Sequence, residues 1–224
     1  MTGWNNIEEM FAALHAAKED YIILRNYEEI DADNFYTSGH ADIDFLTRNN
    51  KRFAACIHAY PRFVSDDGIH YKVLIGDTEV VIDVRSVGDG YYDANWERAM
   101  LHGRVLLDGR FYISDKVNYY YSLVYHAVLQ KKELSGEYLL RLNDMAEKLG
   151  MQAKTEREHL LALEKFMKEK GYSYTIPYDI WVPLRQELID VKMVKRQMNV
   201  RIRDVYTRFM QFGSKVKNVF FIGK

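Results

Sequence analysis

Two acidic residues alternate with apolar ones in the segment Ala41-Asp42-Ile43-Asp44-Phe45-Leu46, and this alternation is the most informative pattern in the chain. Residues two apart on a β-strand point to the same face, so the segment predicts a strand with both carboxylates on one face and Ile43 and Phe45 on the other. Two carboxylates this close repel each other, and they stay ionised together only where a cation or water reaches them. Oxygen ligands of this kind suit Mg²⁺ or Mn²⁺ better than zinc.

Asp83 is a third acidic residue in apolar surroundings, within Glu79-Val80-Val81-Ile82-Asp83-Val84-Arg85. An Asp in such a run is costly to bury unless it is paired or binds a metal. If its strand lies beside the first one, the three carboxylates can hold two divalent ions together. Two alternatives stay open: the Asp pair is solvated on an edge strand, or Asp83 pairs with a nearby basic residue such as Arg85.

The remaining sequence indicates an α+β protein, with a small mixed β-sheet and helices over 1–113 and a helical domain over 114–224. We expect two hairpins, turning at Gly76-Asp77 and at Asp108-Gly109. The expected strands cover 21–24, 41–46, 70–75, 79–85, 104–107 and 110–113. The expected helices cover 7–14, 52–59, 95–101, 114–132, 136–149, 155–170 and 183–212. Ser114 is the expected N-cap of the fourth helix.

Composition and missing motifs exclude several classes of protein. The chain has 224 residues, a net charge of -1 and one cysteine, Cys56. An intramolecular disulfide and a cysteine-based zinc site are therefore excluded, and a cytoplasmic location is expected. No apolar run approaches the roughly 18 residues of a membrane span. The chain also lacks the P-loop, the dinucleotide-binding glycine motif and the nucleophile elbow, so those enzyme classes have no support.

The chain resembles the nucleotidyltransferase fold of the polymerase-beta-like superfamily. That pattern has an apolar strand, a loop, an Asp-apolar-Asp-apolar strand and a third Asp on a later strand. Here these parts are 21–24, 25–41, Asp42-Ile43-Asp44-Phe45 and Ile82-Asp83-Val84. Further segments look like uncharacterised bacterial members found near surface-polysaccharide genes: Leu24-Arg25-Asn26-Tyr27, and Tyr125-His126-Ala127 with Lys131. The resemblance covers residues 20 to 132.

This resemblance implies a metal-dependent transfer of a nucleotidyl group. It implies that Asp42 and Asp44 bind two Mg²⁺ or Mn²⁺ ions, and that Asp83 binds the ion nearest the acceptor hydroxyl. Asp83 is also the candidate to take the proton of that hydroxyl. The hydroxyl attacks the α-phosphorus of a nucleoside triphosphate in line, and pyrophosphate leaves. The implied acceptor is a small molecule, a sugar or a polysaccharide-linked group. A toxin-like enzyme acting on RNA or protein, and a non-catalytic binding module, are the alternatives.

One departure from the family pattern concerns the triphosphate. Members usually have Gly-Gly or Gly-Ser directly after the first strand, whereas this chain has Arg25-Asn26 there and Ser38-Gly39 just before the Asp strand. Arg25 is therefore a candidate phosphate clamp, with an ordinary salt bridge as the alternative. The candidate nucleotide-binding residues are Arg25, Asn26, Ser38, Gly39, Lys72, Arg85, Tyr125, His126 and Lys131.

Simpler structural roles compete with binding for several candidates. Tyr125 can pack on the sheet with its hydroxyl at the rim, His126 can be a hydrogen-bonded core histidine, and Lys72 and Arg85 can lie on a solvated strand face. A run rich in basic residues, from Lys192 to Lys217, is interleaved with apolar ones. It predicts a helix that either packs its apolar stripe on the core or makes peripheral membrane contact through 192–224, with nucleic acid or a protein partner as further options.

Overall fold

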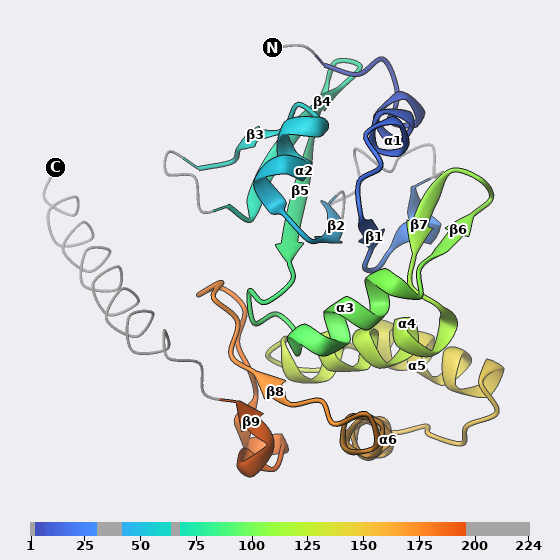
Figure 1. Ribbon diagram of the computed structural model, residues 1–224. Coiled ribbons are helices and arrows are strands. Elements are labelled where there is room, and N and C mark those ends of the chain that lie inside the picture. Colours follow the sequence, from blue (N-terminus) through green and yellow to red (C-terminus); the bar gives the residue numbers. More distant parts are fainter. Residues whose placement is uncertain (1–2, 31–41, 64–67, 196–224) are drawn as a thin grey trace, which may run out of the picture.

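The computed structural model describes residues 3–30, 42–63 and 68–195. Within them, a mixed seven-stranded sheet in the order β3-β4-β5-β2-β1-β7-β6 is combined with helices, so the protein has the expected α+β fold (Figure 1). The strands of this sheet are β1 (Tyr21–Ile23), β2 (Asp42–Thr47), β3 (Tyr60–Pro61), β4 (His70–Ile75), β5 (Thr78–Ser86), β6 (Val105–Leu107) and β7 (Phe111–Ile113). A second sheet pairs β8 (Tyr174–Thr175) with β9 (Val194–Lys195).

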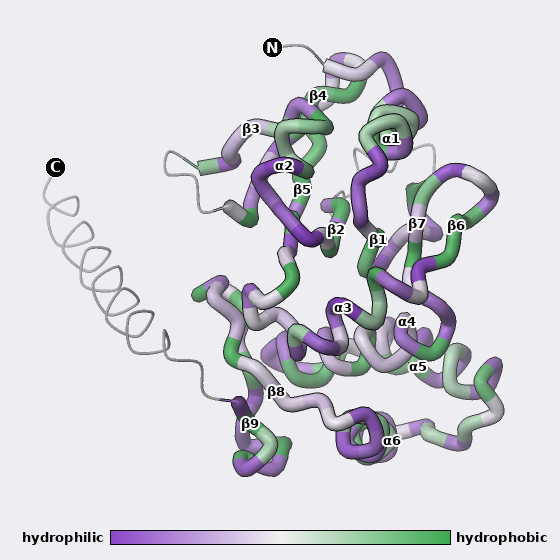
Figure 2. Tube along the Cα trace, viewed as in Figure 1, coloured by the Kyte–Doolittle hydropathy of each residue, from purple (hydrophilic) through white to green (hydrophobic). Residues whose placement is uncertain are grey.

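The helices form two groups around the main sheet. In the first group, α1 (Ile7–Ala16) and α2 (Asn50–Cys56) pack on one face of the sheet. The second group gathers beyond one end of the sheet (Figure 1) and consists of α3 (Ala94–His102), α4 (Lys116–Val124), α5 (Gly136–Lys148) and α6 (Glu156–Lys170). Figure 2 shows hydrophilic and hydrophobic residues mixed along α6, as expected for a helix with one buried face.

The strand β2 lies in the interior of the sheet, so the edge-strand alternative for the Asp pair is wrong. It pairs with β1 in antiparallel and with β5 in parallel orientation, and Asp44 lies opposite Asp83 in the second pairing. The expected hairpin of β4 and β5 is present. Gly76 has a φ of 56°, the left-handed conformation that its two-residue turn requires.

Alternation along the strands gives the sheet two faces with separate cores. On one face, Ile43, Phe45, Ile82 and Val84 pack with α1 and α2. On the other face, residues such as Leu46 join the aromatic-rich core of α3 to α6. Because the acidic residues of β2 alternate with the first set, their carboxylates lie on the face that meets the second group of helices.

The helix expected over 114–132 differs from the structure at both ends. Asp115 is its N-cap, not Ser114, because the Asp115 carboxylate accepts the backbone N–H of Val117 and of Asn118 at 3.0 and 3.1 Å. The α-helix ends at Val124, and residues Tyr125–Leu129 continue as one π-helical turn. Such turns occur frequently at functional sites.

The helix expected over 183–212 is wrong over the part that the structure describes. Residues 183–195 contain the 3₁₀ helices Gln186–Leu188 and Val191–Met193, followed by β9. The Asp190 side chain accepts the backbone N–H of Lys192 at 2.9 Å and so caps a new turn instead of continuing a helix.

Some predictions lie outside the described residues or have no test in the structure. Ser38, Gly39 and residues 196–224 lie outside, so their binding roles and the membrane contact stay predictions. The domain division at 113/114 stays a prediction as well. In the described ranges, no helix is both long and apolar enough to cross a membrane.

The start of α6 allows a test of local stability. Thr155 accepts the backbone N–H of Glu158, and the Glu158 carboxylate accepts that of Thr155, which is a complete capping box. Thr155→Ala is expected to lower the free energy of unfolding by about 1 kcal/mol. Urea unfolding measures the difference, with Thr155→Ser as the control that keeps the hydroxyl. An unchanged midpoint in the alanine variant would show that this cap does not stabilise the protein.

Candidate metal and nucleotide site

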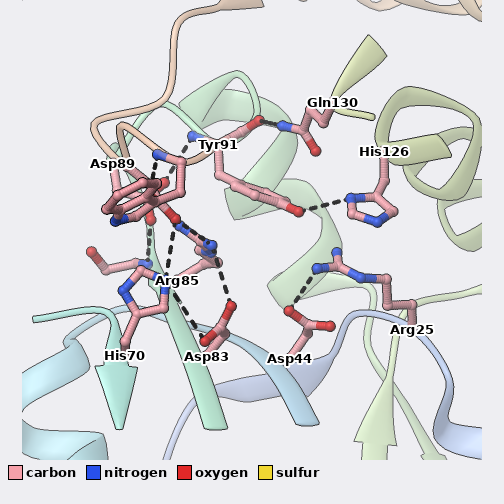
Figure 3. A network of polar contacts seen from close by, with 12 residues as sticks. Arg25, Asp44, His70, Asp83, Arg85, Asp89, Tyr91, His126 and Gln130 are labelled. Atoms are coloured by element: carbon pink, nitrogen blue, oxygen red, sulfur yellow. Dashed lines mark hydrogen bonds and ion pairs between the residues drawn. The ribbon is translucent and has the colours of Figure 1, made fainter. Parts of the chain in front are cut away.

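Three carboxylates meet on the sheet face that turns toward the helices. Asp42 and Asp44 come from β2, and Asp83 comes from the neighbouring strand β5. One carboxylate oxygen from each residue lies within 4.8 Å of the other two. Figure 3 shows Asp44 and Asp83 rising side by side from their strands. Asp44 is 2% exposed, whereas Asp42 and Asp83 are partly exposed.

Burial and mutual repulsion make the ionised forms of two of these carboxylates costly. Burial raises the pKa of Asp44 to about 7; the charges of Asp83 and Asp42 add to the rise, and Arg25 opposes it. Burial also raises the pKa of Asp83, against the lowering effect of nearby basic groups. A cation bound among the carboxylates would favour the ionised form of each, because it offsets both desolvation and repulsion.

Arg25 contacts the acidic cluster directly. Its Nη2 lies 2.6 Å from Asp44 Oδ1, and both side chains are buried. The guanidinium also lies over the ring of Tyr91, with Cζ 5.6 Å from the centroid. Its Nη1 is buried and has no hydrogen-bond partner in the described part of the chain. Arg25 therefore forms the salt bridge expected as the alternative, and it keeps a free donor that a phosphate oxygen could accept.

Arg85 and His70 lie at the opposite side of the cluster, next to Asp83 (Figure 3). Arg85 Nη2 lies 3.5 Å from Asp83 Oδ2, and His70 Nε2 lies 3.9 Å from Asp83 Oδ1. Both basic groups are closer to Asp179, at 2.8 Å for Arg85 and 3.4 Å for His70. Arg85 is 2% exposed, so the solvated strand face expected as its alternative is wrong.

Tyr91 connects the acidic cluster with the helices. The Cζ of Arg85 lies 4.4 Å from the centroid of its ring, and its hydroxyl lies 3.0 Å from His126 Nδ1. Burial, together with the positive charges of Arg25 and Lys131, holds the pKa of His126 well below its usual value, so the imidazole is neutral. Burial raises the pKa of Tyr91 to about 12, so its hydroxyl keeps its proton and can donate to the imidazole.

Two of the predicted nucleotide-binding residues have other partners. Tyr125 is fully buried in the helical core, and its hydroxyl accepts the backbone N–H of Thr175 at 3.2 Å. Lys72 forms an ion pair with Glu79, with 2.5 Å between Nζ and Oε2. Neither bond involves the three carboxylates, although Lys72 lies on the same face of the sheet as they do.

Asn26 and Lys131 belong to the surroundings of the cluster. Asn26 follows Arg25 with a φ of 57°, and its Oδ1 accepts from Arg141 Nη1 at 2.9 Å. The Asn26 side chain lines a cavity of about 60 Å³ together with Glu29, Glu137, Tyr138 and Arg141. Lys131 is exposed and follows the π-helical turn, and its charge reaches His126.

Sequence analysis gave no functional role to two residues of this network, His70 and Asp179, and considered Tyr91 only as part of a loop, residues 88–93, that is either an acceptor-binding or gating loop or an ordinary turn. For His70 a signal was present, because a two-residue turn at Gly76-Asp77 fixes a hairpin register in which residue 70 pairs with residue 83. Asp179 and Tyr91 lie in irregular segments, where no periodic pattern assigns a direction to a side chain. Their positions follow from tertiary packing alone.

The donor set of the cluster fits a hard divalent cation. Three aspartates provide oxygen ligands, and Asp83 Oδ1 is buried without a hydrogen-bond partner among the described residues. Buried carboxylate oxygens are seldom left without a partner, so this atom is available for a ligand. Mg²⁺ and Mn²⁺ prefer such oxygen ligands.

Comparison with known proteins gives little further information. No protein-family model matches the chain, and no curated protein matches its sequence. Among solved structures, it is similar to the antibiotic-resistance factor ANT(2'')-Ia, known from a solution structure. That match has a TM-score of 0.40 and 13% sequence identity, and it covers 74% of this chain and 91% of the other. A likeness at this level assigns no activity, so the function must be inferred from the residues of the site.

Proposed function

We propose that this chain is a metal-dependent nucleotidyltransferase, which moves a nucleoside monophosphate from a nucleoside triphosphate to an acceptor hydroxyl. The observation that supports this best is the parallel pairing of β2 and β5, which places Asp42, Asp44 and Asp83 within 4.8 Å of one another. The same three residues form the sequence pattern that resembles the polymerase-beta-like superfamily. The acceptor proposed is a small molecule, a sugar or a polysaccharide-linked group.

Each carboxylate has a proposed role in this reaction. Asp42 and Asp44 would hold two Mg²⁺ or Mn²⁺ ions with Asp83, and bound ions of this kind neutralise phosphate charge and orient the reactants. Asp83 takes the proton of the acceptor hydroxyl while the oxygen bonds to the α-phosphorus and the bond to pyrophosphate breaks. Burial raises the pKa of Asp83, which makes it a stronger base for this proton.

Arg25 is the proposed clamp for the triphosphate. One guanidinium nitrogen holds Asp44 at 2.6 Å, while the buried Nη1 keeps a donor without a partner in the described residues. A phosphate oxygen beside the cluster would accept from it, which replaces the backbone contacts of the missing Gly-Ser pair. Asn26 follows Arg25 in the chain, and the charge of Lys131 acts on His126, which contacts Tyr91; these three residues are the proposed contacts for the outer phosphates. Tyr125 and Lys72 are bound to other groups, so their predicted contact with the nucleotide gains no support.

Calorimetry tests the proposed function. Titration of the protein with ATP, CTP, GTP or UTP in the presence of Mn²⁺ should show binding of at least one nucleotide. That binding should require the metal and disappear in Asp42→Asn/Asp44→Asn. Asp77→Asn, an exposed residue in the turn between β4 and β5, is the matched control and should bind normally. If the wild type binds no nucleotide, the chain is better described as a binding module that kept the fold.

Metal binding is expected to weaken as the pH falls below about 7. The pKa of Asp44 is raised to about 7, mainly by burial, and a protonated carboxyl group is a poor metal ligand. Below this pKa the proton competes with the metal, so each further pH unit lowers the apparent Mn²⁺ affinity about tenfold. Calorimetry at pH 6 and pH 8 measures the change, and equal affinities would contradict the assigned pKa.

The raised pKa of Asp44 also affects the stability of the metal-free protein, which should fall as the pH rises, whereas metal binding should strengthen. The pKa of Asp44 in the native state, about 7, lies well above the usual value for an aspartate in an unfolded chain. The native state therefore binds this proton more tightly than the unfolded state does. The stability contributed by neutral Asp44 is fully present below pH 4 and is lost as the pH rises through 7. Saturating Mn²⁺ should reduce this loss, because the metal binds the ionised form.

A further inference from the structure

Asp179 is a buried acidic residue outside the three-carboxylate cluster. It belongs to the irregular segment between β8 and the end of the described chain and is 5% exposed. Its Oδ1 accepts the backbone N–H of Trp181 at 2.9 Å, which fixes the carboxylate in place. Burial alone would raise the pKa of Asp179, but His70, Arg85 and the Trp181 N–H together hold it below its usual value, so the group is ionised.

Two basic groups are shared between Asp179 and Asp83. The Nη2 atom of Arg85 lies 2.8 Å from Asp179 Oδ2 and 3.5 Å from Asp83 Oδ2. The Nε2 atom of His70 lies 3.4 Å from Asp179 Oδ2 and 3.9 Å from Asp83 Oδ1. Asp179 is therefore the nearer partner of both basic groups, and Asp83 is the more distant one.

The position of Arg85 makes such a counter-ion necessary. Arg85 and Asp83 are two residues apart on β5, so their side chains leave the same face of the strand. The guanidinium is buried against Tyr91 and cannot reach bulk water easily. Without another partner, it would pair with Asp83 and place a positive charge where a divalent cation must bind.

We infer that Asp179 is a positioning residue for the metal site: it neutralises Arg85, holds His70, and thereby leaves Asp83 free to bind a divalent cation. The inference rests on the proposed function, because it assumes that the cluster binds metal. It gives the segment after α6 a role in the metal site, and no sequence motif indicates that role. Metal binding and the packing of this segment are then coupled through one ion pair.

The inference predicts how metal affinity responds to four variants. Asp179→Asn keeps the size and the acceptor for Trp181 but loses the charge, and it should weaken Mn²⁺ binding roughly 10- to 100-fold. Arg85→Gln removes the competing cation and should bind Mn²⁺ at least as tightly as the wild type. In the double variant the loss should vanish, with an affinity within about threefold of Arg85→Gln alone. Asp190→Asn, in the same segment but bonded to Lys192, should leave the affinity unchanged.

Electron paramagnetic resonance of free Mn²⁺ gives these affinities without nucleotide or turnover. If the wild type binds no Mn²⁺, the proposed function fails. If it binds and Asp179→Asn binds equally well, only the inference fails. An additive loss in the double variant would mean that Asp179 merely supports the fold, which also overturns the inference. Thermal unfolding checks each variant; should Asp179→Asn not fold, weaker binding by Arg85→Gln would overturn the inference.

Discussion

Asp44→Asn is expected to lower the rate of Mn²⁺-dependent pyrophosphate release from a nucleoside triphosphate about 1000-fold, which corresponds to about 4 kcal/mol. Asp44 lies opposite Asp83 in the sheet and is 2% exposed, so bulk water has little access to the position of its carboxylate. The asparagine keeps the size of the side chain and an oxygen that can accept from Arg25. It cannot supply the negative charge that holds a divalent cation. Water can serve as a slow acceptor in this assay, so the natural acceptor is not needed.

Asp77→Asn provides the control for this experiment. Asp77 lies in the exposed turn of the β4–β5 hairpin and carries the same change of charge away from the cluster. Its rate should equal that of the wild type. Circular dichroism should show that both variants are folded. If a folded Asp44→Asn variant keeps more than a tenth of the wild-type rate of pyrophosphate release, Asp44 has no essential role in the reaction.

Arg25→Gln is expected to lower the free energy of unfolding of the metal-free protein by about 3 kcal/mol at pH 8. The substitution leaves the buried carboxylate of Asp44 without its partner at 2.6 Å, beside the further negative charge of Asp83. Protonation of Asp44 limits the loss at lower pH. Mn²⁺ should restore part of the stability, because it supplies positive charge to the same carboxylate. Urea unfolding with and without Mn²⁺ measures both effects.

Arg48→Gln is the matched control for the stability experiment. Arg48 also pairs with an aspartate, at 2.7 Å from Asp20, but both side chains are substantially exposed. An exposed pair of this kind contributes at most about 1 kcal/mol. The control should therefore lose little stability, and Mn²⁺ should not rescue it. Equal losses in the two variants, or no rescue of Arg25→Gln, would contradict the placement of Arg25 against the cluster.

Local pattern predicted those parts of the fold that depend on periodicity. The alternation in β2 placed Ile43 and Phe45 on the face that packs with α1 and α2, and it placed the aspartates on the other. Glycine-containing turns predicted both hairpins, and the position of Asp83 on its strand was predicted correctly. In each case the signal lies within a few residues, where backbone geometry determines the direction of side chains.

Long-range pairing and the choice between similar caps could not be predicted. Nothing in the sequence required β2 and β5 to be neighbours, so the cluster remained conditional on that pairing. Ser114 and Asp115 are both good N-cap residues, and packing selected the second. Asp179 reaches the site from an irregular segment that has no periodic pattern. The charged network around the cluster is therefore a property of the tertiary structure.

A crystal grown with Mn²⁺ and a nonhydrolysable nucleoside triphosphate provides the most direct test of the metal site. The anomalous difference map should show manganese bound by Asp42, Asp44 and Asp83, with roughly 2.0–2.3 Å between metal and carboxylate oxygens and the triphosphate on the same metal. Arg25 Nη1 should lie within hydrogen-bond distance of a phosphate oxygen. A triphosphate bound elsewhere, or a cluster without an anomalous peak at saturating Mn²⁺, would contradict the proposed site.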